Sequence, residues 1–369
     1  MKKIMFFIPY LLGGGAERVV VNLLKGLDKS KFDIKLVVID EKGPFLNEVP
    51  KEVEIIELST NRTLTALFPL ARVIRSYEPE LLISHLDYAN VISVLACKLF
   101  NRKTKIFVTE HLNYSASKSS HKLSSSVLKK LMSITYKYAD CIVTVSKGIT
   151  NDLIKILNYS KYSDKFTTVY NPIVLEEEKN SIKEVHWFEE NKFKVLGAGR
   201  LTAQKDFPTL IKAFAIVKEE LPNARLVIIG EGEERENLEK QIQNLNLSEC
   251  VSLPGFVDNP HYNMKVADLF VLSSKWEGFG NVIVEAMAEK TAVISTDCPS
   301  GPNEIIDNNI NGVLCKPGDA ESLAKAILSL AKDDQLRNKI ALKGYERSQD
   351  FKVQKIAKEY ESLILDYCK

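Results

Sequence analysis

Short apolar runs alternate with longer segments of helical period along this chain. The runs of the first half are continuously apolar, without the polar alternation of a half-exposed strand. Continuous apolar strands that are separated by helices indicate a parallel sheet with both faces covered. The expected strands are 4–8, 34–39, 53–58, 81–84, 106–109, 142–145 and 167–169, and the expected helices are 16–27, 64–77, 88–99, 124–138 and 148–157.

The pattern stops after Pro172 and then starts again. A polar, acidic stretch without a strong period, residues 175–191, separates the two series and is typical of a linker. The strands expected in the second series are 194–197, 225–229, 251–253, 269–272, 292–295 and 312–315, and the helices are 207–220, 234–245, 260–266, 282–289 and 320–331. One more helix is expected near the end, at 353–365.

These two series predict an α/β chain of two Rossmann-like, doubly wound parallel-sheet domains that face each other across a cleft. A length of 369 residues agrees with two domains at about 150 residues each. Ligands of such sheets bind outside the carboxyl ends of the strands, so the active site is expected in the cleft. The expected divisions are a first domain at 1–172, a linker at 173–192, a second domain at 193–352 and a C-terminal helix at 353–369 that can pack on either domain, including back on the first.

Composition excludes several other classes of protein. With 45% hydrophobic and 27% charged residues, the chain is neither disordered nor a small disulfide scaffold. Its six cysteines form no C-x-x-C pair, so we expect neither a zinc site nor a redox motif but buried thiols in a reducing cytosol.

The sequence contains no run of 18 apolar residues, so no transmembrane helix is expected. The basic start and apolar residues 4–12 resemble a signal peptide, but Pro9 and the charged segment that follows favour a first strand.

Glycines follow the first strand of each predicted domain. Gly13, Gly14 and Gly15 precede a helix, where a close backbone approach and a helix N-terminus favour an anion. The dinucleotide fingerprint G-x-G-x-x-G fails there because Arg18 occupies its sixth position, and it fails again after Gly197. This disfavours a nicotinamide oxidoreductase, while a tight turn without a ligand stays an alternative.

Charged residues follow the central strands of the second series. Arg200 and Lys205 share one loop and can converge on a diphosphate, although loop cations are usually only solvated. Further on, glycines flank Phe279 directly before a helix, which directs backbone amides toward an anion. Glu277 and Glu285, eight residues apart, frame that turn, and each taken alone could be an ordinary surface carboxylate.

Together these motifs resemble the GT4 family of retaining glycosyltransferases, which have the GT-B fold. The resemblance covers essentially the whole chain, with the motifs in the family's order and spacing. It rests on Glu277-(x)7-Glu285 with its internal Gly-Phe-Gly, on Gly199-Arg200-(x)4-Lys205, on the Gly-Gly-Ala-Glu-Arg turn near the N-terminus, on the Gly-Glu-Gly turn at 230–232 and on the Leu-Pro-Gly-Phe segment at 253–256.

The resemblance implies a role for each matched residue. Arg200 and Lys205 would neutralise the donor diphosphate, Glu285 would accept hydrogen bonds from the ribose, and His111 would lie near the donor sugar as the active-site histidine. Glu277 would hold sugar hydroxyls. The remaining donor-binding residues that it implies are Gly14 and Gly15 at the distal phosphate, Gly230 in its turn, Phe256 and Val257 at the nucleobase, and the backbone of Phe279, Gly280, Asn281 and Val282 at the phosphate.

No D-x-D motif occurs in the sequence, which favours catalysis without a divalent metal or other cofactor. Departure of a nucleoside diphosphate leaves negative charge, and preorganised cations and helix-start amides can stabilise it as it develops. The resemblance further implies retention by front-side attack, in which the leaving phosphate helps to deprotonate the acceptor. The segment at 299–304 resembles the subset that transfers hexoses or N-acetylhexosamines in bacterial surface-polysaccharide assembly, and UDP is the expected nucleotide.

The net charge of +2 conceals an asymmetry between the two halves. Residues 1–172 carry 25 basic and 16 acidic side chains, whereas the remainder carries 25 and 32. The nearly balanced total charge argues against a nucleic-acid partner. A basic amphipathic segment at 118–138, however, can lie on an anionic membrane. An ordinary surface helix is an equal alternative. The lysines concerned are Lys118, Lys122, Lys129, Lys130 and Lys137.

The expected enzyme is therefore a cytoplasmic glycosyltransferase, peripheral on the inner face of the membrane, with a polyprenyl-diphosphate-linked or other cell-surface glycan as acceptor. Two alternatives stay open from the sequence. One is a GT-B transferase or phosphorylase with a soluble acceptor. The other is a sugar-nucleotide-binding protein without catalytic activity.

Overall fold

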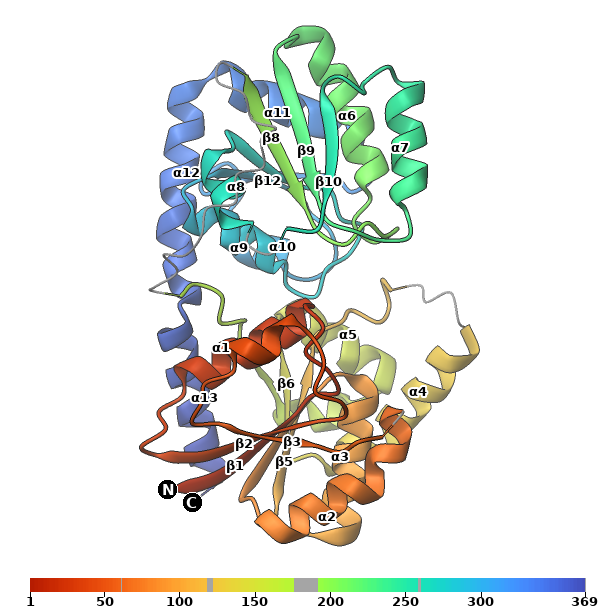
Figure 1. Cartoon of the computed structure of the whole chain (residues 1–369), viewed down its shortest axis with the longest axis vertical. Helices are drawn as coiled ribbons and strands as arrows, with labels where there is room; N and C mark the ends of the chain where they lie inside the picture. The colour runs from red at the N-terminus through yellow and green to blue at the C-terminus, as the bar shows by residue number, and fades with distance from the viewer. Residues whose placement is uncertain (61, 118–121, 176–191, 258–259, 369) are drawn as a thin grey trace. The chain divides into compact units, whose positions relative to one another are not determined.

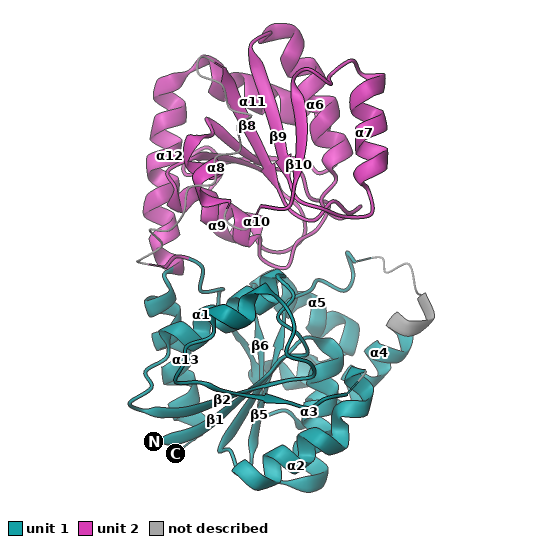
Figure 2. Ribbon diagram, viewed as in Figure 1, with its two compact units in different colours: residues 1–173, 352–369 teal, residues 174–351 magenta. Residues whose placement is uncertain are grey.

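The computed structural model describes residues 1–60, 62–117, 122–175, 192–257 and 260–368. The chain forms two compact units (Figure 2). Unit 1 comprises Met1–Ile173 and Lys352–Lys369, and unit 2 comprises Val174–Phe351. Most of the predicted linker, 176–191, lies outside the described residues.

Unit 1 is built on a seven-stranded sheet in the order β3-β2-β1-β4-β5-β6-β7. Every neighbouring pair is parallel. The residues of β4 are all buried, and in β5 and β6 only Lys105 is exposed, as expected of strands covered on both faces. The strands are β1 (Lys2–Phe7), β2 (Phe32–Val38), β3 (Glu54–Glu57), β4 (Leu81–His85), β5 (Lys105–Glu110), β6 (Cys141–Thr144) and β7 (Phe166–Thr168).

The main helices of unit 1 include one from the C-terminal end of the chain. Figure 1 shows α13 beside α1, and the two pack against each other. Gly26 permits this contact, because a Cβ there would lie 2.8 Å from side-chain atoms of Val353 and Ala357. The backbone N–H of Asp28 donates to Glu361 at 2.9 Å. The α-helices are α1 (Gly15–Gly26), α2 (Leu67–Tyr77), α3 (Asp87–Phe100), α4 (Lys122–Thr135), α5 (Lys147–Leu157) and α13 (Val353–Tyr367).

Unit 2 is built on a six-stranded sheet in the order β10-β9-β8-β11-β12-β13, also parallel throughout. Its strands are β8 (Phe193–Ala198), β9 (Ala224–Ile229), β10 (Val251–Gly255), β11 (Leu269–Leu272), β12 (Ala292–Thr296) and β13 (Val313–Cys315). Its α-helices are α6 (Phe207–Glu220), α7 (Arg235–Asn244), α8 (His261–Val266), α9 (Asn281–Ala288), α10 (Pro302–Ile305), α11 (Ala320–Lys332) and α12 (Asp334–Ser348).

Every strand and helix expected from the sequence has a counterpart at nearly the same residues, and the α/β class is confirmed. The sequence pattern did not predict α10 or α12. The first is a single turn, and the second buries only Ile340, Ala341, Gly344 and Ser348, so its apolar period is weak.

The order of the strands reverses once in each sheet, between β1 and β4 in unit 1 and between β8 and β11 in unit 2. Loops on either side of such a point diverge to opposite faces and leave a crevice at the carboxyl edge. The two crevices are therefore the places where each unit is expected to bind a ligand.

Candidate active site

In unit 2, the predicted donor-binding residues lie after four neighbouring strands. Arg200 and Lys205 follow β8, Gly230 follows β9, and Glu277 follows β11. Phe256 and Val257 follow β10 at the edge of the same sheet. Because the strands are parallel, these loops share one edge of the sheet.

The reversal point of this sheet is bridged by an ion pair. Lys205 Nζ lies 2.6 Å from Glu277 Oε1, with 15% and 8% of the two side chains exposed. Ser274 donates a hydrogen bond to the same carboxylate oxygen at 2.6 Å. The other oxygen of Glu277, Oε2, has no partner among the described residues. One oxygen is thus fixed by the protein, and the other is available to a hydroxyl group.

Four further contacts join the loop after β8 to the loop after β11. Gln204 donates from its side chain to the carbonyl of Trp276 at 2.9 Å, and its own carbonyl accepts from the N–H of Lys275 at 2.8 Å. Ser273 Oγ donates to the carbonyl of Lys205 at 2.8 Å. Lys275 Nζ lies 3.1 Å from the carboxylate of Asp206, of which 5% is exposed. We call these contacts, with the Lys205–Glu277 pair, the β8–β11 seam.

The Gly-Phe-Gly turn ends at the start of α9, as predicted. Its Phe279 is 2% exposed and packs edge-on against Phe351, with 5.4 Å between ring centroids. Gly301, with φ of +94°, lies so close that a Cβ on it would overlap the carbonyl of Phe279. Glu285 lies in α9, one turn after Asn281. Buried contacts with Phe351 and Gly301 therefore hold the turn in place, and they fix the position of the N-terminal end of α9.

The structure brings some of the predicted residues together and leaves others apart. A Cβ on Gly230, with φ of +142°, would overlap the carbonyl of Gly199, so this glycine allows the loops after β8 and β9 to touch. Arg200 is exposed and has no side-chain partner among the described residues. Phe256 is 62% exposed, and residues 258–259 beyond it lie outside the described range.

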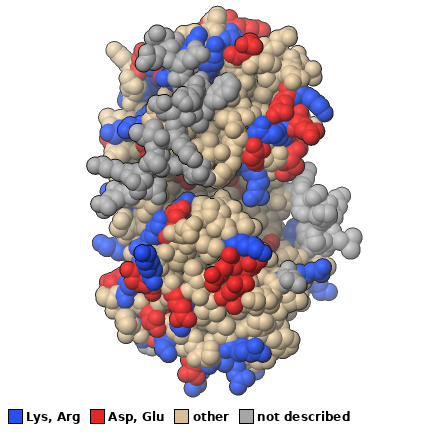
Figure 3. Space-filling model, viewed as in Figure 1, with Lys and Arg blue, Asp and Glu red and all other residues tan. Residues whose placement is uncertain are grey.

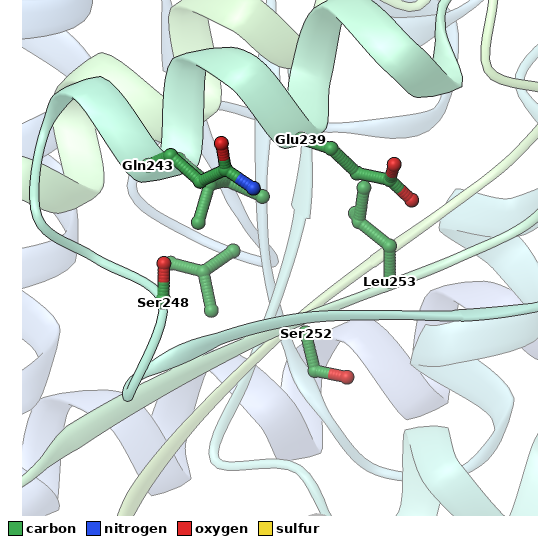
Figure 4. Close-up of a pocket in the computed structure, with 7 residues that line it drawn as sticks. Glu239, Gln243, Ser248, Ser252 and Leu253 are labelled. Atoms are coloured by element: carbon green, nitrogen blue, oxygen red, sulfur yellow. The ribbon is translucent and has the colours of Figure 1, made fainter.

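A separate groove of unit 2 lies between α7 and β10 (Figure 4). It contains none of the predicted residues. Its walls carry one charged side chain, Glu239, which already pairs with Arg235 at 2.8 Å. The lining residues are Glu239, Ile242, Gln243, Ser248, Val251, Ser252 and Leu253.

In unit 1, Gly14 caps the N-terminus of α1 and Gly15 is its first residue. Arg18 in the next turn forms an ion pair with Glu48 and lies over the ring of Phe45, 3.9 Å from its centroid. This arginine, which breaks the dinucleotide fingerprint, therefore packs within its own unit.

His111 follows β5 directly and contacts a second histidine. Its Nε2 lies 3.1 Å from Nδ1 of His85, the last residue of β4. His85 is fully buried, whereas His111 is partly exposed. Burial lowers the pKa of His111 to about 4, and burial together with the neighbouring His111 lowers that of His85 well below its ordinary value. Both imidazoles are therefore neutral at pH 7.

A buried carboxyl group precedes His111. Glu110 accepts hydrogen bonds from Asn90 at 2.9 Å, from Tyr114 at 2.8 Å and from Tyr136. Burial, and next the nearby charge of Asp87, raise the pKa of Glu110 to about 7. This network joins β5, α3 and the segment after α4, and it fixes the backbone from which His111 projects.

Two properties of the described residues bear on cofactors and membranes. They contain no group of three or more His, Cys, Asp or Glu side chains that could hold a metal ion. None of the helices within those ranges is long and apolar enough to cross a membrane.

Comparison with known proteins identifies the family of this chain. Residues 13–177 match the model described as Glycosyltransferase Family 4, and residues 178–347 match the one described as Glycosyl transferases group 1. A relative from Campylobacter jejuni, N-acetylgalactosamine-N,N'-diacetylbacillosaminyl-diphospho-undecaprenol 4-alpha-N-acetylgalactosaminyltransferase, is 32% identical over 376 residues, which cover 99% of this chain and 100% of the relative. The chain belongs to glycosyltransferase family 4.

Other relatives agree. An uncharacterized glycosyltransferase from Methanocaldococcus jannaschii is 32% identical over 396 residues, covering 93% of this chain and 95% of its own. The crystal structure of Anabaena HepE in complex with UDP and glucose matches with a TM-score of 0.82 and 22% identity over 99% of both chains. That likeness shows the GT-B fold. The resemblance inferred from the motifs, the fold and the enzyme class are thus confirmed.

The sequence motifs of this glycosyltransferase did not reveal all the residues that shape the site. Ser274, Lys275 and Asp206 lay beside quoted motifs but carried no separate signal. His85 did carry one, since it ends a predicted strand that neighbours the strand before His111. Gly301 lies in a segment noted only for its resemblance, and its role depends on a close approach that no local pattern shows.

The β8–β11 seam predicts a stability difference between two lysine variants. Lys275→Met leaves the Asp206 carboxylate, 5% exposed, without its cation. We expect the free energy of unfolding to fall by about 1–3 kcal/mol, because a buried charge loses its partner. Lys332→Met is the matched control, since its pair with Glu220 has 56% and 49% exposed side chains and should contribute less than about 1 kcal/mol. An equal decrease in the free energy of unfolding for the two variants, measured by chemical denaturation, would show that the Lys275–Asp206 contact stabilises the protein no more than an exposed ion pair does.

The raised pKa of Glu110 predicts a pH dependence. Between about pH 4.5 and pH 7, the unfolded chain releases this proton while the folded protein retains it, so stability falls as the pH rises. Glu110→Gln has no such proton and should lose about 3 kcal/mol less over this range. Glu54→Gln, on a side chain that is 61% exposed, serves as control and should follow the wild type. Parallel curves for wild type and Glu110→Gln would refute the shift.

Proposed function

We propose that this enzyme transfers a hexose or N-acetylhexosamine from a UDP-sugar to a polyprenyl-diphosphate-linked glycan, with retention and without a metal ion. The observation that carries the proposal is the Lys205–Glu277 pair at the reversal point of unit 2, in which one carboxylate oxygen is held and the other is open. In this arrangement Lys205 supplies a cation for a phosphate, and the neighbouring Glu277 supplies a hydrogen-bond acceptor for a sugar hydroxyl.

The relatives support both substrates. The Campylobacter jejuni relative is named as acting on a diphospho-undecaprenol-linked sugar, and the Anabaena structure contains UDP and glucose. These descriptions apply to those proteins. For this enzyme, they support UDP as the nucleotide and a lipid-linked diphosphate as the acceptor's anchor.

In the proposed donor complex, Arg200 and Lys205 neutralise the diphosphate. The exposed Arg200 is unconstrained and can adopt a bidentate geometry, whereas Lys205 is held in place by Glu277. Glu277 Oε2 accepts a sugar hydroxyl, and Glu285 accepts the ribose hydroxyls. The other proposed donor contacts are the amides of Phe279, Gly280, Asn281 and Val282, the backbone at Gly230, Phe256 and Val257, and Gly14 and Gly15 from unit 1.

The proposed step exchanges one bond at the anomeric carbon for another on the same face. The bond from this carbon to the diphosphate oxygen breaks, and its electron pair leaves with UDP. The acceptor hydroxyl oxygen forms the new bond, while its proton passes to an oxygen of the leaving phosphate. Arg200, Lys205 and the amides before α9 stabilise the charge that develops on that phosphate, the part that a metal ion plays in other enzymes.

The proposed acceptor side includes α4. Within its described residues, Val127 and Ile134 are 55% and 47% exposed, and Tyr138 in the following turn is 52% exposed. Lys130 is exposed, and Lys129 and Lys137 are partly exposed. Lys118 and the side chain of Lys122 lie outside the described residues. Apolar and basic side chains together favour an anionic lipid surface, so we propose a cytoplasmic enzyme on the inner face of the membrane.

Turnover tests the donor site. With UDP-glucose, UDP-galactose and their N-acetylated forms as a panel, wild-type enzyme should release UDP slowly by hydrolysis from at least one. Lys205→Ala and Arg200→Ala should each lower kcat for that donor about 100-fold, because each removes preorganised charge from the leaving group. Lys212→Ala, an exposed cation of α6, is the control and should match the wild type. Near-normal turnover in the double variant Arg200→Ala/Lys205→Ala would overturn the assignment.

Vesicle binding tests the membrane surface. Vesicles containing phosphatidylglycerol should bind wild type, and Lys129→Glu/Lys130→Glu should bind at least tenfold more weakly, since each nearby cation contributes about 1 kcal/mol. Lys325→Glu/Lys339→Glu reverses two exposed lysines of unit 2 and makes the same change in net charge. Equal weakening by the two double variants would show only a general charge effect and would contradict docking by α4.

A further inference from the structure

His85 is a buried polar residue that the proposed reaction does not use. It ends β4, between the strands that precede Gly14 and His111, at the carboxyl edge of unit 1. Its side chain is 0% exposed. Burial of an imidazole without full hydrogen bonding destabilises the folded state, so its presence at this edge calls for a physical reason.

The two ring nitrogens of His85 have different surroundings. Nδ1 lies 3.1 Å from Nε2 of His111, within hydrogen-bond distance. Nε2 is buried and has no partner among the described residues. One face of the ring lies nearly parallel to Phe6, at 13° and 6.1 Å between centroids. Packing and one hydrogen bond therefore determine how the ring lies.

The contact between the two rings requires that only one of the two facing nitrogens, His85 Nδ1 or His111 Nε2, carries a hydrogen. Both imidazoles are neutral at pH 7, because burial lowers the pKa of each. Two N–H groups cannot face each other at 3.1 Å, and two lone pairs would repel. Hence one histidine donates to the other, and the choice determines which nitrogen of His111 carries the remaining proton.

Burial favours one of the two arrangements. If His85 carried its proton on Nε2, that N–H would be buried without an acceptor. If it carries the proton on Nδ1, only a lone pair is left unpaired, and in protein interiors orphaned N–H groups are rarer than under-satisfied acceptors. In this arrangement His85 donates to His111 Nε2, and His111 must carry its own proton on Nδ1.

We propose that His85 is a positioning residue that fixes His111 as the Nδ1–H tautomer, so that His111 presents a hydrogen-bond donor to the substrate. His111 is partly exposed, and its Nδ1 has no partner among the described residues, so this N–H can reach a ligand. The functional part of this inference rests on the proposed function and on the place beside the donor sugar that the family resemblance implies for His111.

The surrounding groups keep this pair in place. The backbone on one side of His111 belongs to Glu110, which three hydrogen bonds hold. On the other side, Asp152 accepts from the backbone N–H of Tyr114 at 2.7 Å and of Ser115 at 3.2 Å. His111 therefore has little freedom to turn away from His85.

A fixed Nδ1–H has a chemical consequence. Both nitrogens of His111 are engaged, one as an acceptor from His85 and one as a donor outward. The residue can then stabilise a sugar or phosphate oxygen by donation, but it has no free lone pair with which to take the acceptor's proton. This agrees with proton transfer to the leaving phosphate.

Nitrogen-15 NMR of the full-length protein, labelled at its five histidines, tests the tautomers without any assay of activity. Long-range proton–nitrogen correlations distinguish Nδ1–H from Nε2–H, and His85→Asn and His111→Asn assign the two signals. We expect Nδ1–H for both histidines at pH 7.5, with and without UDP. An Nε2–H signal for His85, or a protonated ring at either position, would overturn the proposal.

Activity variants test the positioning role. His85→Leu fills the space of the imidazole but offers no hydrogen-bond donor. This variant should lower kcat at least tenfold, whereas KM for the UDP-sugar should change less than threefold. Without the hydrogen bond from His85, His111 should become a mixture of tautomers. His85→Asn, whose amide can donate from nearly the same place, should recover at least half of the lost activity on a logarithmic scale. Ser93→Ala is the control: it removes the buried Ser84–Ser93 hydrogen bond of 3.0 Å beside His85 and should lower stability alone.

The outcomes separate this inference from the proposed function. If wild type turns over no UDP-sugar, the proposed function fails, and the NMR result alone still decides the tautomer. If wild type is active but His85→Leu retains full kcat, or if His85→Asn is no better than His85→Leu, the positioning role is wrong while the proposed function stands.

Discussion

Parallel pairing of the strands is the constraint on which every candidate residue depends. It directs the carboxyl ends of all the strands in a unit to one edge, so residues far apart in the chain lie on adjacent loops. Lys205 and Glu277 are separated by 72 positions, and their 2.6 Å contact exists because β8 and β11 are neighbours. The same relation between β4 and β5 brings His85 to His111.

Much of this arrangement could be predicted from residue patterns, because a buried parallel strand is continuously apolar and the loop after it is not. The positions of Arg200, Lys205 and Glu277 after their strands followed from that pattern. The partners of these residues did not, since the contacts of Ser274, Lys275 and Asp206 are set by how two loops lie beside each other. Gly301 shows the same limit, because the neighbouring carbonyl of Phe279 and the positive φ of Gly301 favour a residue without a Cβ there, and neither can be seen in the local sequence.

The charge asymmetry is slightly larger when counted by units of the structure. With the C-terminal helix included, unit 1 carries 29 basic and 19 acidic residues, and unit 2 carries 21 and 29. On the face drawn in Figure 3, however, the basic side chains of unit 1 are interspersed with acidic ones. A net positive charge favours the approach of anionic partners at long range, whereas close contact depends on how the individual charged groups are arranged.

The position of α13 has a further consequence for the architecture. Because residues 352–369 belong to unit 1, unit 2 is an insertion within unit 1, and the chain passes between the units twice. The N–H of Val174 donates to the carbonyl of Phe351 at 3.1 Å, which joins the two passages where they enter unit 2. The insertion also means that residues 174–351 form one continuous segment, whereas unit 1 consists of two separate segments. Expressing unit 1 as a single chain without unit 2 therefore requires a new link between these segments, for example from Ile173 to Lys352.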